Sequence, residues 1–140
     1  MNYWLIKTEP GTWSWDDQNN SPKKTTTWDG VRNYQANNNM KAMRNGDLCF
    51  FYHSVKEKTI VGVVEVVKEH EPDPTDKTGR GFGMVSVKAK TAVKTLVCLG
   101  DIKANDKLAD MVLVNNSRLS VQPVTAGEWK IVCKMAGISS

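Results

Sequence analysis

Hydrophobic positions along the chain fall into short runs separated by polar turns that contain glycine or proline. Residues 3–8 form an aromatic and aliphatic run that stops before a Pro-Gly pair, which predicts a first strand. Residues 48–53 predict a buried aromatic strand, and the valine-rich residues 59–67 fit a pleated surface. Residues 84–90 alternate apolar and polar side chains, as a half-buried strand does, and residues 92–97 predict the next strand.

Capping residues mark where the first two helices begin. Ser14 and Asp17 have the spacing of a capping box and predict a short helix. Asn33 can cap a second helix, which we expect to end at residues 45–46, an Asn-Gly pair. The apolar face of this second helix is predicted to be Tyr34 or Ala36, with Met40 and Met43.

The last helix has the clearest signal. Thr125 and Glu128 form a second capping-box pattern, and Gly137 can end the helix in a left-handed conformation. The residues expected to face the core from this helix are Trp129, Val132, Cys133 and Ala136.

The remaining segments read as connections. Residues 18–27 are polar and contain a proline, so we expect a mobile surface loop, and residues 71–83 are expected to form a second loop. Residues 101–108 predict a short helix or turn, and residues 117–123 a loop or edge strand. Together the elements predict an α+β class protein with a single domain over residues 1–140, built on a small barrel or curled sheet.

Composition narrows the class of partner. The chain has 140 residues, of which 40% are hydrophobic and 24% charged, which suits one globular core. No apolar run approaches the roughly 20 residues of a membrane span, and we expect no signal peptide. The three cysteines are too far apart for a zinc site or a disulfide framework, so we expect no metal and a reduced, cytoplasmic or nuclear setting. The net charge of +4 favours an anionic partner such as nucleic acid.

The stretch WDGVRNYQ, residues 28–35, sets two aromatic rings beside forked hydrogen-bonding groups. Aromatic faces stack on planar heterocycles and polar side chains read their edges, so a base turned out of a duplex or strand would meet both. Because polar residues crowd Trp28 on a loop, we expect it to form a site wall that supports little core. Arg32 can contact a phosphate or base edge, or pair with a structural carboxylate. Among the other tryptophans, Trp4 and Trp129 are predicted to be core, and Trp13 and Trp15 stay unassigned.

Groups suited to catalysis are sparse. The chain has no nucleophile-elbow, zinc-protease or phosphate-loop motif. His70 lies in an acidic, proline-bounded segment and is expected to be a solvated loop residue. His53 ends an apolar strand and is either a structurally satisfied histidine or available to a ligand. Glu9 can be a turn residue, or it can accept a hydrogen bond from the exocyclic amine of a base.

Five segments together resemble one family. They are YWLIKTEP, WDGVRNYQANNNM, GDLCFFYHS, IVGVVEVV with the acidic EPDPTD that follows, and SRLSVQPVTAGEW. In order and spacing they resemble the EVE-domain family, a branch of the PUA-like fold that includes the thymocyte nuclear proteins. The resemblance implies a PUA-like small mixed β-barrel flanked by short helices, with one concave pocket. It also implies that the pocket holds a modified nucleobase, without a cofactor and without catalysis.

The matching motifs carry over a set of base-pocket candidates. The resemblance implies a modified cytosine in DNA as the ligand, with RNA as the other polymer. Two positions depart from the family: Thr8 stands where serine is usual and narrows the space, and Asn37 replaces an arginine, so that a backbone or phosphate contact is missing. A tryptophan often found before the later strand is also absent. The candidates are Lys7, Thr8, Glu9, Trp28, Arg32, Asn33, Tyr52, His53, Ser54, Ser117, Arg118 and Ser120.

Two alternatives to a modified-base reader remain open at the level of the sequence. One is a hydrolase acting on a nucleotide, with Glu9 or His53 as acid or base, although no nucleophile–base pair or metal set accompanies them. The other is a protein-interaction subunit whose pocket is vestigial.

Overall fold

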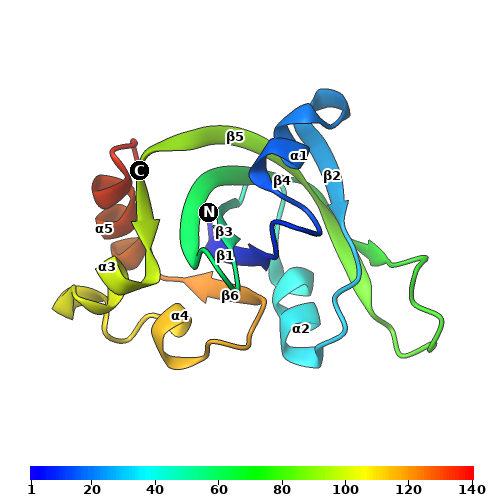
Figure 1. Ribbon diagram of the computed structural model, residues 1–140. Coiled ribbons are helices and arrows are strands. Elements are labelled where there is room, and N and C mark those ends of the chain that lie inside the picture. The colour runs from blue at the N-terminus through cyan, green and yellow to red at the C-terminus, as the bar shows by residue number, and fades with distance from the viewer.

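The computed structural model describes all 140 residues. One six-stranded sheet, in the order β2-β5-β4-β3-β1-β6, curls into a barrel-like shape with short helices around it (Figure 1). β1 and β3 are parallel and the other neighbours are antiparallel. The expected α+β class is confirmed. The strands are β1 (Tyr3–Thr8), β2 (Thr25–Trp28), β3 (Leu48–His53), β4 (Thr59–Pro72), β5 (Gly83–Cys98) and β6 (Val121–Val124).

All three predicted helix starts are confirmed. Ser14 and Asp17 cap α1 reciprocally, and the Asn33 side chain accepts a hydrogen bond from the third residue of α2. Thr125 and Glu128 form the capping box of α5, which ends at Gly137. The longest helix, α5, has 11 residues, and no helix has the length and apolarity that crossing a membrane requires. The helices are α1 (Trp15–Asn20), η1 (Pro22–Lys24), α2 (Tyr34–Ala42), α3 (Leu99–Lys103), η2 (Asp106–Leu108), α4 (Val112–Asn115) and α5 (Ala126–Ala136).

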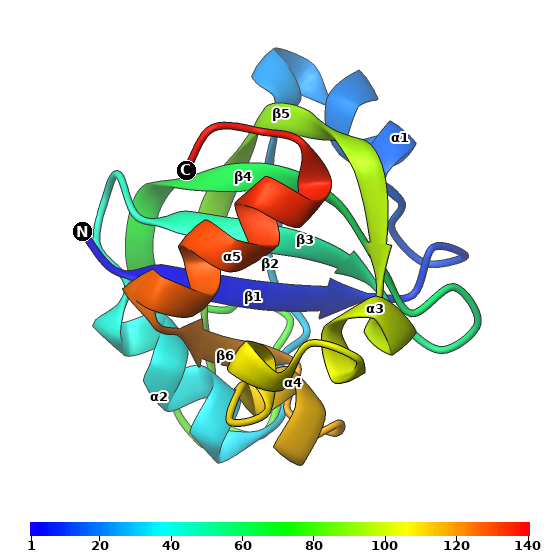
Figure 2. The same ribbon diagram turned by 90° about the vertical axis from the view of Figure 1, so that its left-hand side faces the viewer.

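Two hydrophobic clusters lie on opposite faces of the sheet. Side chains alternate along a strand, so Phe50 of β3 faces one cluster and Phe51 the other. α5 covers the Phe50 face, where Trp129 stacks on the Phe50 ring at 3.9 Å between centroids (Figure 2). α2 closes the Phe51 face with Met40 and Met43. The core positions predicted for Trp4 and Trp129 are confirmed.

The prediction of a mobile loop over residues 18–27 is wrong. This segment contains the end of α1, the η1 turn and the short edge strand β2. The Gln18 side chain is fully buried and hydrogen-bonds residues near and far in sequence. The polar composition of residues 18–27 suggested a segment exposed to solvent, but both polar atoms of the Gln18 amide have partners inside the protein.

Three further boundaries differ from the prediction. β4 extends to Pro72, and the two strands expected over residues 84–97 form one bulged strand, β5. α2 ends at Ala42 rather than at residues 45–46. Ala36 is the core residue of α2, whereas Tyr34 is 58% exposed.

His70 and Asn37 are interior residues, contrary to the prediction of a solvated histidine. His70 lies half-buried in β4, and its Nε2 donates to the Asn37 Oδ1 at 2.9 Å. The same oxygen accepts the backbone N–H of Gly83, and the Asn37 Nδ2 donates to the Gly81 carbonyl. Burial, together with the charge of Lys41, lowers the pKa of His70. Position 37 therefore ties α2 to the start of β5.

Candidate functional site

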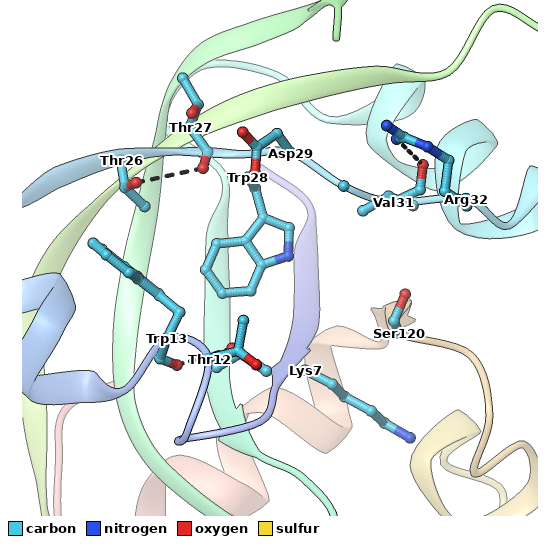
Figure 3. A pocket seen from close by; sticks show the side chains of 12 residues that line it. Lys7, Thr12, Trp13, Thr26, Thr27, Trp28, Asp29, Val31, Arg32 and Ser120 are labelled. Atoms are coloured by element: carbon cyan, nitrogen blue, oxygen red, sulfur yellow. Dashed lines mark hydrogen bonds between the residues drawn. The ribbon is translucent and has the colours of Figure 1, made fainter. Parts of the chain in front are cut away.

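A cavity of about 480 Å³ opens where the end of β1, the following turn, β2 and the segment after β2 meet (Figure 3). This volume lies within the usual range for small-ligand pockets, ~300–1,000 Å³. Nine of its 12 lining residues are polar or glycine. The lining residues are Lys7, Thr8, Thr12, Trp13, Thr26, Thr27, Trp28, Asp29, Gly30, Val31, Arg32 and Ser120.

Two indole rings form aromatic walls of this cavity (Figure 3). Trp28 reaches it from β2, and Trp13 from the turn between β1 and α1. Trp28 is only 8% exposed, and its ring contacts the Phe51 ring edge-on, with centroids 5.6 Å apart. The expectation that Trp28 supports little core is therefore wrong, because the ring belongs both to the cavity and to a hydrophobic cluster.

The orientation of Trp13 is fixed from behind by Gln18. The Trp13 indole Nε1 donates to the Gln18 Oε1 at 2.9 Å. The Gln18 Nε2 donates to the Lys24 carbonyl at 2.8 Å and to the Val87 carbonyl of β5 at 3.2 Å. One buried amide thus joins the aromatic wall to η1 and to the sheet.

The segment between Trp28 and α2 is held by the buried carboxylate of Asp73. Its Oδ2 accepts the Gly30 N–H at 2.8 Å and the Arg32 guanidinium at 3.0 Å. Its Oδ1 accepts both the backbone N–H and the hydroxyl of Thr75. Burial alone would raise the pKa of Asp73, but these hydrogen bonds outweigh it and hold the pKa far below its ordinary value. The carboxylate therefore stays ionised and shapes this wall.

Arg32 pairs with a structural carboxylate, which is one of the two roles that the sequence left open for it. While paired with Asp73, its side chain is still 35% exposed. Gly30, two residues earlier, has φ +78°, a left-handed conformation that glycine adopts without strain. The tight path from Trp28 to Arg32 depends on both features.

Lys7 places an amine at the opposite side of the cavity. Its Nζ donates to the Ser117 carbonyl at 2.7 Å and lies 5.7 Å from the centre of the Tyr52 ring. Its backbone N–H donates to the Ser120 carbonyl at 2.9 Å. Burial lowers the pKa of the Lys7 amine. These contacts join the end of β1 to the segment before β6.

The structure brings five of the twelve predicted pocket residues together at the cavity and leaves seven outside its lining. The five are Lys7, Thr8, Trp28, Arg32 and Ser120. Those outside have other places in the fold: the Glu9 carbonyl accepts the N–H groups of the next turn, Asn33 caps α2, and Tyr52 and His53 are buried in β3. The seven are Glu9, Asn33, Tyr52, His53, Ser54, Ser117 and Arg118.

His53 is a structurally satisfied strand-end histidine. It is 7% exposed, and its Nε2 accepts the backbone N–H of Trp15 at 3.0 Å. The proton is therefore on Nδ1, which donates to the Glu57 carboxylate at 2.8 Å. His53 thus links β3 to the start of α1. Neither His53 nor Glu9 lines the cavity, so the hydrolase alternative loses both of its candidate groups.

The sequence interpretation missed most of the threonine side of the cavity. Thr26 and Thr27 fell in the segment read as a mobile loop, and Thr12 lies in an exposed turn. The three β-branched residues before Trp28 are typical of a strand and could have predicted β2. The Thr8 hydroxyl donates to the Trp13 carbonyl at 2.8 Å and so fixes the turn that carries Trp13.

Known proteins are similar to this chain in sequence and in fold. The EVE domain model matches residues 2–135. Human thymocyte nuclear protein 1 is 34% identical, over 96% of this chain and 73% of that protein. Rpa0253 from Rhodopseudomonas palustris, a solved structure, is 52% identical with a TM-score of 0.91, over 98% of this chain and 94% of that one.

Two neighbours were solved as nucleic-acid complexes. Human THYN1 in complex with 5-methylcytosine-containing DNA is 34% identical with a TM-score of 0.90, over 100% of both chains. The YTH domain of Zygosaccharomyces rouxii MRB1, in complex with N6-methyladenosine RNA, is 17% identical with a TM-score of 0.59, over 99% of this chain and 89% of that one. The second likeness shows the fold alone. The predicted PUA-like fold is confirmed, and the chain belongs to the EVE-domain family.

Proposed function

We propose that the chain acts as a single EVE domain that binds nucleic acid and holds one unpaired or flipped modified base in the cavity beside Trp13 and Trp28. The observation that carries the proposal is the pairing of two indole walls with a polar lining in one cavity. A modified cytosine in DNA is the favoured ligand, because the homologous human THYN1 was solved with 5-methylcytosine-containing DNA. RNA is the alternative polymer.

The cavity supplies the two kinds of contact that a base requires. The indole faces offer stacking, which contributes ~1–3 kcal/mol per base. The Asp29 carboxylate can accept a hydrogen bond from the exocyclic amine of cytosine, and the hydroxyls of Thr26, Thr27 and Ser120 can donate or accept. Threonine methyl groups give apolar contact to a base methyl group. The site is thus suited to recognition of a base by shape and edge together.

The two groups that the sequence offered for catalysis do not line the cavity, which favours binding without turnover. General acid–base chemistry needs a group within hydrogen-bond reach of the proton that moves. The histidine and the glutamate that the sequence offered for that role lie outside the lining. We also propose that the protein works in the reducing setting of the cytoplasm, because its three cysteines, Cys49, Cys98 and Cys133, are free thiols.

The test is a set of oligonucleotides that differ only in one central base: cytosine, 5-methylcytosine or another modified cytosine, in DNA and in RNA. We expect the affinity to be highest for one modification and to fall in Trp13→Ala. Leu96→Ala is the matched control, because Leu96 is 63% exposed and lies eleven residues along β5 from Val85, the strand partner of Trp28. Equal affinity for all central bases would refute the proposal. No measurable affinity for any of the oligonucleotides would also refute it and would favour the protein-interaction alternative.

A further inference from the structure

Tyr34 exposes an aromatic face that the protein does not cover. It is 58% exposed, and its ring is stacked on the Phe82 ring with centroids 5.0 Å apart and planes 29° from parallel. Phe82 is only 4% exposed, so the buried ring supports the exposed one. An exposed aromatic ring held in place in this way has little conformational freedom to lose when a flat ligand stacks on it.

This aromatic pair is continuous with the cavity wall. The Arg32 guanidinium carbon lies 5.7 Å from the centre of the Phe82 ring, and Arg32 itself lines the cavity. The backbone at Asn33 is extended, with φ −115° and ψ 128°, so Arg32 and Tyr34 are separated by at most about 7 Å along the chain. The platform and the cavity wall are therefore adjacent parts of one short segment.

Both rings are held in position by the surrounding backbone. Tyr34 is the first residue of α2, whose start is capped by Asn33. The backbone N–H of Phe82 donates to the Asp76 carboxylate at 3.3 Å, and Asn37 binds the neighbouring Gly81 carbonyl at 3.2 Å. The two rings therefore belong to segments that are fixed before any ligand arrives.

The segment between β4 and β5 that ends at Phe82 carries two cations and two carboxylates. Lys77 and Arg80 lie exposed there, and neither makes an ion pair with a carboxylate. The carboxylates of Asp73 and Asp76 instead accept hydrogen bonds within the protein, from Arg32, two threonine hydroxyls and backbone N–H groups. Cations beside a stacking face are the combination with which proteins hold a single strand, because they attract the phosphates while the ring takes the base.

We infer that Tyr34, supported by Phe82, forms a second stacking platform for the nucleobase next to the one held in the cavity. This inference rests on the proposed function, because it requires a nucleic acid whose central base occupies the cavity. The occupant is a base of the same strand, since the platform continues from the Arg32 wall and the segment that ends at Phe82 carries two cations outside ion pairs.

The test combines a protein change with a ligand change. The ligands are two single-stranded DNA heptamers with a central 5-methylcytosine, one intact and one with abasic sites on both sides of the modified base. We expect wild-type protein to bind the abasic heptamer about 5- to 150-fold more weakly, the fold-change that corresponds to the stacking of one base. Tyr34→Ala should bind the intact heptamer as weakly as wild-type protein binds the abasic one, and it should not distinguish the two.

Tyr34→Phe is the conservative control and should restore binding of the intact heptamer, because it keeps the ring. The inference would be overturned if Tyr34→Ala lost the same fraction of its affinity for both heptamers, or lost affinity for neither. In either case, a preference of wild-type protein for one central base would still support the proposed function. If wild-type protein does not distinguish 5-methylcytosine from cytosine or another modified cytosine in the intact heptamer, the proposed function itself fails. The melting temperature of Tyr34→Ala should fall by no more than about 5 °C, because the variant loses one stacked aromatic pair at a side chain that is largely exposed.

Discussion

Truncation of Trp28 to alanine is expected to damage folding and binding together. The ring is 8% exposed and packs in a buried cluster with Phe51, Val85 and other apolar side chains. Removing a buried tryptophan side chain costs ~3–5 kcal/mol, a large fraction of the ~5–15 kcal/mol that keeps a domain folded. The same ring is a cavity wall, so the loss of stacking should weaken binding by a further ~1–3 kcal/mol.

The expected change in melting temperature follows from chain length. Unfolding entropy of ~2.1 cal/mol/K per residue gives about 0.29 kcal/mol/K for this chain, so a loss of 3–5 kcal/mol lowers the melting temperature by about 10–17 °C. Circular dichroism during heating measures that shift. Fluorescence anisotropy with a labelled oligonucleotide, at a temperature where the variant is still folded, measures the affinity.

Two comparison variants separate the roles of the ring. Trp13→Ala removes a half-buried cavity wall that packs only against the edge of the Trp28 cluster, so it should lose a similar amount of affinity with a smaller drop in melting temperature. Trp28→Phe keeps an aromatic ring and should lie between wild type and Trp28→Ala in both measurements. If Trp28→Ala melts within 3 °C of wild type, the core role derived from burial is wrong. If it melts early but binds with unchanged affinity while folded, the cavity-wall role is wrong.

Three further predictions concern buried contacts around the cavity, and a fourth concerns the polymer. The pKa of Asp73 in the folded state lies below its unfolded value of ~3.9, so the carboxylate stabilises the protein above that pH and this contribution is lost as the pH falls. In Asp73→Asn the free energy of unfolding should therefore depend less steeply on pH between pH 5 and 2. An unchanged slope would contradict this. Gln18→Leu removes the acceptor of the Trp13 indole N–H and the donor to the Lys24 and Val87 carbonyls, so chemical denaturation should show a loss of ~1–3 kcal/mol and oligonucleotide affinity should fall. Gln18→Glu, which keeps the acceptor, is the comparison. Gly62→Ala would put its Cβ into the Trp15 ring and should cost ~1–3 kcal/mol, whereas Gly127→Ala, with no atom within 4 Å, should not destabilise. Affinity should fall only gradually as salt rises, because the sequence has no dense basic run; a steep dependence would indicate many phosphate contacts.

The sequence was most informative where structure depends on neighbouring residues. Ser14, Asn33 and Thr125 cap helices by bonding backbone groups only three residues away, so their effect is readable from local spacing. The apolar runs of β1, β3, β4 and β5 were likewise visible, because these strands are rich in aromatic and β-branched side chains.

Contacts between distant segments were not predictable in this way. Gln18 was assigned to a solvated loop because nothing nearby in the sequence reveals the Val87 carbonyl, 69 residues away, to which it donates. The family motif placed His53 in the pocket and its position at a strand end left both roles open, yet its ring nitrogens bind Trp15 and Glu57. Residues at the end of a strand can face either a ligand or the next turn, and only the path of that turn decides between them.

The cavity is built largely from turns and one short edge strand, and two buried polar side chains make these segments rigid. Gln18 holds the wall that carries Trp13, and Asp73 holds the segment from Gly30 to Arg32. A site whose walls are fixed in advance loses little conformational entropy on binding, so most of the stacking energy appears as affinity. Fixed walls also cannot widen to admit a larger group or close around a smaller one. Selection among modified bases should therefore depend on the shape set by these two buried anchors, while the cations outside the cavity contribute affinity for any strand.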